Sequence, residues 1–196
     1  DLVQAGLYLH ASSLAARGMI EEVIILTERI LLNFESNETK KYTDSYFELL
    51  LFQAQNHLGQ GDTIKAKPLI DKANVFSSKK SHKPVYSSFL KTKGIYALLT
   101  GNYDEAKLYL LKSLRHIEKR QPQGNVSLEY AYRCAELSSV FLGMNELDEA
   151  ARLIDKALVI IDPIKNQIPL HFNQIKIMEA NIELAKGNKA PAFQIA

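Results

Sequence analysis

The side chains best suited to chemistry of their own are five histidines and a single cysteine. The histidines are scattered along the chain, at His10, His57, His82, His116 and His171. A helical zinc site needs two histidines four residues apart with a glutamate beside them, and no pair here has that spacing. We therefore expect no metal site and no cofactor.

Cys134 is preceded by Ala131 and followed by Leu137, a spacing that places all three on one face of a helix. This pattern favours a packed, inert thiol over a nucleophile. His57 also lies on an apolar face, where we expect a core residue with satisfied hydrogen bonds. Neither a phosphate-binding glycine loop nor a nucleophile elbow appears, so the sequence predicts that the chain is not an enzyme.

Charge gives little reason to expect nucleic acid or a membrane as partner. There are 24 lysines and arginines against 22 acidic residues, which leaves no strong overall field. Basic residues gather at Lys79–Lys83 and Lys112–Arg120 without alternating aromatic residues, and solvated helix ends explain them better than phosphate binding does. No apolar run approaches the roughly 20 residues of a membrane-spanning helix.

A recurring turn organises the elements that must position these residues. A glycine or asparagine is followed five positions later by a small residue, as in Gly101 to Ala106 and Asn145 to Ala150. The turn residues Gly18, Gly61, Gly101, Asn145 and Gly187 are separated by 43, 40, 44 and 42 residues. A near-constant period of this length indicates a tandem repeat in which each unit packs on its neighbours.

Apolar residues at helical spacing on both sides of each turn predict antiparallel helical hairpins. Longer polar stretches containing most of the prolines separate the hairpins, whereas Pro68 lies inside a helix that it could shorten or kink. The predicted helix pairs are 2–17 with 20–33, 43–59 with 62–76, 84–100 with 103–119, and 127–143 with 146–161, followed by 169–186 and a fragment from 189.

The pattern resembles the tetratricopeptide repeat. The best matches are Gly94, the turn at Gly101, Ala106 and Leu110 in one repeat, and Phe141, Ala150, Ala157 and the closing Asp162-Pro163 in the next. The resemblance covers repeats at about 2–33, 43–76, 84–119 and 127–161, with a partial one at 169–196, in one solenoid. The period of 40–44 residues is longer than the usual 34. It is similar to long-period variants in the kinesin light chain, cell-polarity adaptors and bacterial peptide sensors. The opening segment Asp1–Tyr8 is also similar to helical subunits of the anaphase-promoting complex.

This resemblance implies an all-α fold, a right-handed α-α superhelix whose first helices line a concave groove for a peptide or partner helix. The residues implied to face the groove include Tyr8, Gln55, Leu58, Lys91, Ile95, Tyr132, Ser139, Gln174 and Asn181. For each of them, packing against the next repeat is the alternative. Relatives that bind chaperone C-termini need further Lys, Asn and Arg side chains one turn apart, but Ile95 and Glu136 occupy two of those places. We expect no such clamp.

We therefore expect a protein-protein interaction scaffold, as part of a multi-protein complex. The alternative is a ligand- or peptide-sensing regulatory segment of a larger signalling or transcription-control protein. With one cysteine there can be no internal disulfide, which suits the cytoplasm or nucleus. The chain starts without methionine and stops inside an expected helix, so we interpret it as an excerpt of a longer protein that could self-associate through its open C-terminal edge.

Overall fold

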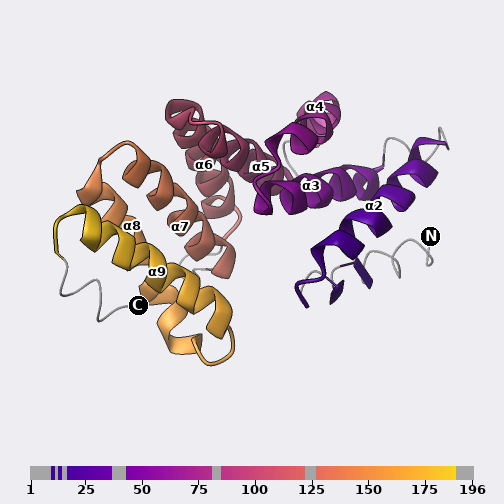
Figure 1. Ribbon diagram of the computed structural model, residues 1–196. Helices are drawn as coiled ribbons and strands as arrows, with labels where there is room; N and C mark the ends of the chain where they lie inside the picture. The colour runs from indigo at the N-terminus through magenta and orange to yellow at the C-terminus, as the bar shows by residue number, and fades with distance from the viewer. Residues whose placement is uncertain are drawn as a thin grey trace. The chain divides into compact units, whose positions relative to one another are not determined.

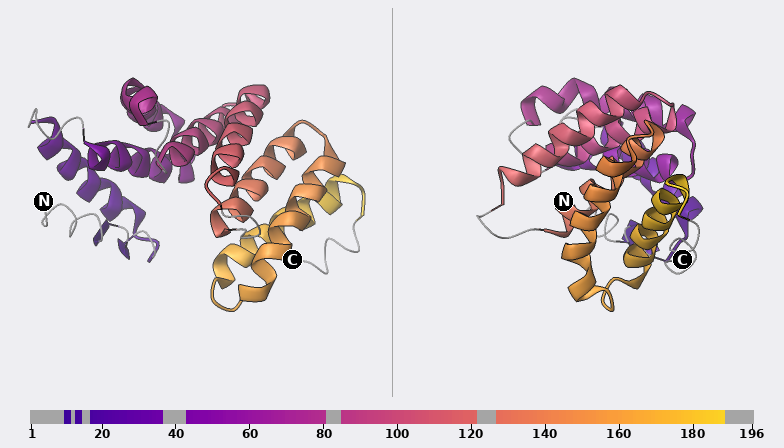
Figure 2. Two further views of the ribbon diagram at one scale, coloured as in Figure 1. Left: turned by 180° about the vertical axis from the view of Figure 1, so that it is seen from behind. Right: turned by 90° about the vertical axis from the view of Figure 1, so that its left-hand side faces the viewer.

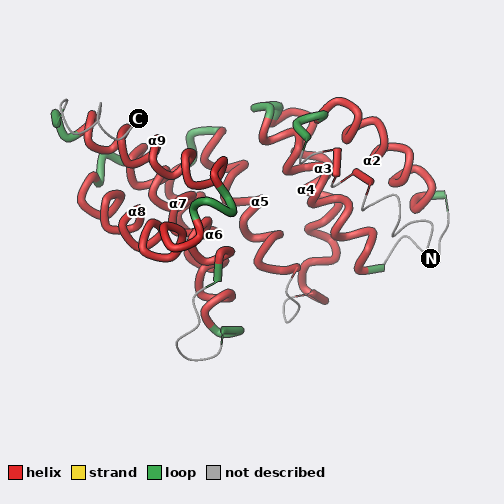
Figure 3. The backbone as a smooth tube through the Cα atoms, turned by 90° about the horizontal axis from the view of Figure 1, so that it is seen from below, coloured by secondary structure: helices red, strands yellow, loops and turns green. Residues whose placement is uncertain are grey.

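The computed structural model describes residues 10–11, 13–14, 17–36, 43–80, 85–121 and 127–188. Within these residues all regular structure is helical and no strand is present (Figure 3), which confirms the expected all-α fold. The labelled helices are α2 (Ile20–Glu35), α3 (Asp44–Gly59), α4 (Thr63–Lys80), α5 (Val85–Leu99), α6 (Tyr103–Glu118), α7 (Leu128–Gly143), α8 (Leu147–Ile161) and α9 (Pro169–Ala185), with a short 3-10 helix, η1 (Asp162–Ile164), after α8 (Figure 1).

The chain divides into two compact units, Asp1–Thr100 and Gly101–Ala196, here called unit 1 and unit 2. Unit 1 contains α2 to α5, and unit 2 contains α6 to α9. In each unit, helices that follow one another along the chain pack together, as repeat architectures require. None of the described helices is long and apolar enough to span a membrane.

The recurring turn has a single backbone conformation at all five predicted positions. Gly18, Gly61, Gly101 and Gly187 have φ values between 75° and 85°, and Asn145 has φ 60°. This left-handed region is open to glycine and tolerated by asparagine, but it strains other residues. The two residue types at these positions are therefore those that the backbone requires.

The same turns satisfy the carbonyl groups that the ending helix leaves without partners. After α3, the N–H of Asp62 donates to the carbonyl of His57 (2.9 Å) and the N–H of Gly61 donates to that of Leu58 (3.0 Å). This pair of bonds is the Schellman motif. It recurs after α7, where Glu146 and Asn145 are the donors (2.9 and 3.0 Å). The repeat is thus visible in individual hydrogen bonds.

The residue five positions after the turn is buried in each copy where the structure describes it. The described examples are Ala66, Ala106 and Ala150, and in the looser first copy Val23 replaces the usual alanine; each has 0% of its surface exposed. A small side chain at this place lets the second helix of a hairpin approach the first. The contact is direct at Ala150, whose carbonyl accepts a hydrogen bond from the Ser138 hydroxyl of α7 (2.8 Å).

Polar caps explain where several helices begin. The side chains of Thr43 and Ser127 accept hydrogen bonds from the N–H groups of Tyr46 and Tyr130, both at 3.3 Å. Such caps replace the intrahelical partners that a first turn lacks. Asp62 does the same for α4, accepting from the N–H of Lys65 (3.0 Å). That bond is the main cause that lowers the pKa of Asp62.

Unit 1 has its core between α2, α3 and α4, with α5 packed on α3 and α4. The largest buried side chains in this core include Phe47, Leu50 and Leu51 of α3. Rings add to the packing, because Phe47 lies 5.8 Å from Phe89 of α5 and Tyr46 lies 6.0 Å from Phe76 of α4. The middle helix α3 therefore contacts helices on both sides.

Unit 2 is built around the hairpin of α7 and α8, with α6 packed on α7 and α9 packed on α8 (Figure 2). Leu137, Ile154 and Ile161 are among the largest fully buried side chains there. Between α6 and α7 the Tyr103 ring lies over Gly143, where an added Cβ would be 2.8 Å from its Cζ. Gly143 thus makes room for the ring.

Most predicted helix bounds differ from the observed ones by a residue or two, and the expectation that Pro68 could shorten its helix was wrong. Instead of shortening its helix, Pro68 lies inside a continuous α4 that runs to Lys80, four residues beyond the predicted end. No glycine or proline follows until Pro84, so nothing in the sequence stops the helix earlier. The predicted helix 2–17 lies largely outside the described residues, as does the fragment from 189.

Candidate functional surfaces

The structure confirms that Cys134 is a packed thiol. Its side chain is fully buried in α7, and burial raises the pKa of the thiol to about 11. Since only the thiolate is a good nucleophile, this cysteine is chemically quiet at neutral pH. Across the described residues, no group of three or more His, Cys, Asp or Glu side chains could hold a metal ion.

His57 is a core residue as expected, but the expectation that its hydrogen bonds are satisfied was wrong. Only 3% of its surface is exposed, and its Nδ1 has no hydrogen-bond partner among the described residues. Burial lowers the pKa of the imidazole, although Asp62 and Glu28 oppose the shift. His57 is therefore neutral at pH 7.

In unit 1, the first helices of two neighbouring repeats, α3 and α5, lie side by side. The Gln55 amide on α3 donates to the Thr92 hydroxyl on α5 (2.9 Å), and this hydroxyl donates to the Ser88 carbonyl (2.7 Å). Lys91 and Ile95 lie one turn apart on α5, and both are half-buried. We call Gln55, Lys91 and Ile95 the first-helix surface of unit 1.

Two residues expected in the groove take part in packing inside unit 1. Leu58 is only 4% exposed and packs with Ala66 and Ile70 of α4, so its placement in the groove was wrong. Ile95 packs against the same cluster while remaining half-buried. Tyr8 lies outside the described residues.

In unit 2, α7 and α9 are again adjacent first helices. Their rings meet where Tyr132 lies 5.0 Å from His171, and burial raises the pKa of the Tyr132 phenol. Ser139 lies two turns further along α7 and is half-buried. Gln174 and Asn181, two turns apart on α9, are exposed. We call Tyr132, Ser139, Gln174 and Asn181 the first-helix surface of unit 2.

The basic residues at the end of α6 are exposed to solvent, as the sequence predicted. Lys112, Arg115, Lys119 and Arg120 are exposed near the C-terminal end of the helix, where cations complement the helix dipole. The side chains of the other basic stretch, from Lys79 to Lys83, lie outside the described residues.

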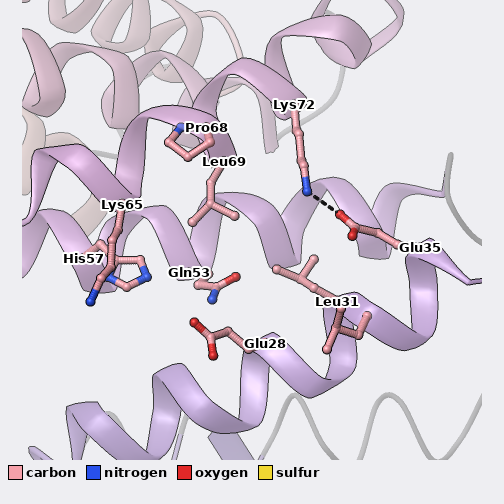
Figure 4. Close-up of a pocket in the computed structure, with 10 residues that line it drawn as sticks. Glu28, Leu31, Glu35, Gln53, His57, Lys65, Pro68, Leu69 and Lys72 are labelled. Atoms are coloured by element: carbon pink, nitrogen blue, oxygen red, sulfur yellow. Dashed lines mark hydrogen bonds and ion pairs between the residues drawn. The ribbon is translucent and has the colours of Figure 1, made fainter.

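A pocket that the sequence did not predict lies between the second helices α2 and α4 of unit 1, with α3 as its floor (Figure 4). Its volume is about 370 Å³. Gln53 and His57 of α3 form the floor, and the walls include Leu31, Pro68 and Leu69. Gln53 and His57 are one turn apart, whereas Gln55 points to the other side of the helix. The pocket and the first-helix surface of unit 1 are thus different faces.

Charged side chains surround the opening of this pocket, and most are paired. Lys72 forms an ion pair with Glu35 (2.6 Å), whose Oε1 also accepts from the Tyr46 hydroxyl (3.0 Å). Lys65 pairs with Asp62 (3.4 Å). Glu28 of α2 has no ion pair within the described part of the chain, and its carboxylate points toward Gln53 (Figure 4).

One sequence signal could have indicated this pocket. His57 stood out as a polar residue on an apolar face, and Gln53 is polar on the same face one turn earlier. Both are buried, at 3% exposure each. Two polar residues at i and i+4 on the core side of a helix predict either a mutual hydrogen bond or a polar cavity, and the structure shows the cavity.

Comparison with known proteins gives structural matches only. No protein-family model matches the sequence, and no curated protein matches it. One match is a solved structure from Podosopora anserina, of a protein of the kinesin light chain type whose own TPR-like repeats are nearly identical. It has a TM-score of 0.69 at 14% identity and covers 97% of this chain and 90% of that one.

Two further structures share the architecture. BtubC (BKLC) from P. vanneervenii matches with a TM-score of 0.72 at 15% identity, covering 97% of this chain and 75% of its own. The MamA protein matches with a TM-score of 0.55 at 15% identity, covering 98% and 87%. At this level of identity the likeness concerns the fold. Together with the recurring turns and helix pairs, it shows that this chain has a fold of antiparallel helical hairpins like that of the TPR-like repeat structures.

Proposed function

We propose that the chain is a protein-interaction scaffold that binds an extended peptide or a partner helix along its first helices. The observation that carries this proposal is the pairing of adjacent first helices within each unit, α3 with α5 and α7 with α9. Each pair holds half-buried residues beside one another, and α9 adds the exposed amides of Gln174 and Asn181. Mixed polar and apolar surfaces of this kind suit peptide recognition.

Preorganisation is the physical basis of the proposed binding. The hydrogen bond between Gln55 and Thr92 and the ring contact between Tyr132 and His171 tie neighbouring first helices together before any ligand arrives. A receptor that is already ordered loses little conformational entropy on binding, so more of the contact energy appears as affinity. The scaffold needs no chemistry of its own, and we propose a non-catalytic role in a multi-protein complex.

The test selects binding peptides from a random display library and measures their affinity by fluorescence anisotropy. We expect the double variant Gln174→Ala/Asn181→Ala to weaken binding about tenfold, the loss of one or two hydrogen bonds. Both residues are exposed, so folding should be preserved. Asp155→Ala/Val159→Ala, which changes exposed residues of the second helix α8, is the matched control. Equal affinities for the two double variants would show that the first-helix surface of unit 2 is not the peptide-binding site.

The alternative, a peptide-sensing regulatory segment, uses the same surfaces with a different consequence. Peptide binding would then change the packing between neighbouring hairpins and not only cover the first helices. Amide hydrogen exchange measured with and without a selected peptide separates the two: protection confined to the first helices supports the scaffold, whereas altered exchange at the hairpin turns supports the sensor.

A further inference from the structure

The pocket between α2 and α4 contains two buried polar atoms that the protein itself does not use. Oε1 of Gln53 and Nδ1 of His57 have no hydrogen-bond partner among the described residues, although each side chain is only 3% exposed. Buried polar groups without partners cost folding free energy and are rare in native proteins. Both side chains lie on the floor of a pocket of about 370 Å³ (Figure 4). The two atoms themselves have almost no accessible surface, so a ligand group reaches them only when these side chains rotate toward the opening.

Each of the two atoms can accept a hydrogen bond from a ligand. The Gln53 oxygen can only accept, and a neutral imidazole protonated on Nε2 accepts at Nδ1. The charges that face His57 are those of Asp62, Lys65 and Glu28, and burial outweighs them in lowering the pKa of the ring. His57 is thus neutral at pH 7 and available as an acceptor. With the imidazole proton on Nε2, a ligand group that carries at least two N–H or O–H donors satisfies both atoms.

The charge at the pocket favours a cation. Lys72 is paired with Glu35, and Lys65 with Asp62. The carboxylate of Glu28, which points toward Gln53, has no such partner in the described part of the chain. A positively charged donor would complete an ion pair with it, and charge-assisted hydrogen bonds are the stronger ones.

The walls add a requirement for an apolar stem. Leu31, Pro68 and Leu69 line the sides between the opening and the polar floor. An aliphatic chain can pack along them while its charged end reaches the acceptors, as long basic side chains do elsewhere. The volume lies at the small end of ligand pockets, which suits one side chain better than a folded segment.

We propose that this pocket binds the guanidinium group of an arginine side chain presented by a partner protein. The planar guanidinium has five N–H donors in a fixed geometry, enough for Gln53, His57 and Glu28 together. The site lies on the second-helix face of unit 1 and does not depend on the first-helix surfaces. The scaffold would then hold partners on two faces.

The test uses N-acetyl-arginine-methylamide as probe and follows amide chemical shifts of the full chain by NMR during titration. We expect saturable shifts in α2, α3 and α4 around the pocket. The uncharged citrulline analogue should bind about tenfold more weakly, because it loses the charge-assisted bonds. Equal binding of arginine and citrulline, or shifts spread over acidic residues elsewhere, would overturn the proposal. Tighter binding of butylguanidinium, which lacks peptide groups, would assign the pocket to a free small guanidine and overturn the protein-borne arginine.

Variants separate binding from folding. Glu28→Gln removes the charge, and Gln53→Met removes the acceptor while keeping an unbranched side chain of similar size. We expect each to weaken binding about tenfold. Gln53→Met should also raise the midpoint of thermal unfolding, because it removes a buried atom without a partner. Glu48→Gln, an exposed position on α3, is the matched control and should bind normally. Normal binding by Glu28→Gln and Gln53→Met would show that the pocket is not the site.

Discussion

His57 links the stability of unit 1 to pH through burial of a single side chain. Burial lowers the pKa of the folded imidazole below its ordinary 6.5, despite the opposing charges of Asp62 and Glu28 and with a smaller contribution from Lys65 in the same direction. Between the folded and the unfolded pKa, the unfolded chain binds more protons than the folded one. Stability must therefore fall as the pH drops below about 6.5 through the folded pKa.

We predict that the free energy of unfolding, measured by urea denaturation, decreases between pH 7.5 and pH 5.5. His57→Leu should make this decrease smaller, since it removes the group whose protonation favours unfolding. Leu58→Val, at another buried position of α3, serves as the control: it removes no titratable group and should keep the wild-type slope. An identical slope in His57→Leu would show that other groups cause the pH dependence.

For single residues, the sequence predicted which side chains are buried better than it predicted their hydrogen-bond partners. The apolar neighbours at helical spacing placed Cys134 and His57 in the core, and both are buried. The polar pair Gln53 and His57 on α3 could have indicated a cavity, but the lack of a partner for Nδ1 depends on which side chains of α2 and α4 face it, and these are distant in the sequence. Burial of Gln53 was not predicted, because a polar residue in a helix is ordinarily assigned to solvent.

The element that the sequence determined most completely is the turn between helices. All five predicted turn residues have positive φ. A Cβ added at Gly61 would meet no atom within 4 Å, so the only cost of a side chain there is the left-handed backbone. Gly59, two residues earlier, is also open but is helical with ordinary φ.

We predict opposite effects for two neighbouring glycine substitutions. Gly61→Ala should destabilise by about 1 kcal/mol, because alanine disfavours the left-handed region. Gly59→Ala should stabilise by about 0.5 kcal/mol, because alanine is the better helix former. Thermal unfolding of the two variants provides the measurement. Loss of stability in both would mean that side-chain contacts, and not backbone conformation, control this turn.

Helix ends were less predictable than turns. The predicted end of α4 at residue 76 follows from the polar stretch Ser77–Lys80, but the structure continues the helix through it. The Phe76 ring centroid lies 6.0 Å from that of Tyr46 of α3, so a contact outside the helix holds α4 as far as the predicted end, from which the helix continues. Tertiary contacts of this kind are invisible to local propensity.

For the whole molecule, unequal burial implies unequal local stability. α7 buries side chains along its full length, from Ala131 to Phe141, whereas α9 buries only Ile175, Ala180 and Ile182. In repeat architectures each helix is stabilised mainly by its neighbours, so opening can occur helix by helix.

We predict that backbone amides of α7 and α8 exchange with solvent more slowly than those of α9. Native-state hydrogen exchange followed by mass spectrometry checks the order with peptides from each helix. Uniform protection across unit 2 would indicate that its helices open together, and would contradict the view that each hairpin contributes separately.

The buried thiol of Cys134 gives the molecule a practical property. It is the single cysteine of the chain, it is fully buried, and its pKa is raised to about 11. Thiol-specific reagents should therefore leave the native protein unmodified, and any reaction would report transient opening of α7. A cysteine introduced on either first-helix surface could carry a fluorophore without first replacing the native one, so both surfaces are open to distance measurements in the otherwise unaltered chain.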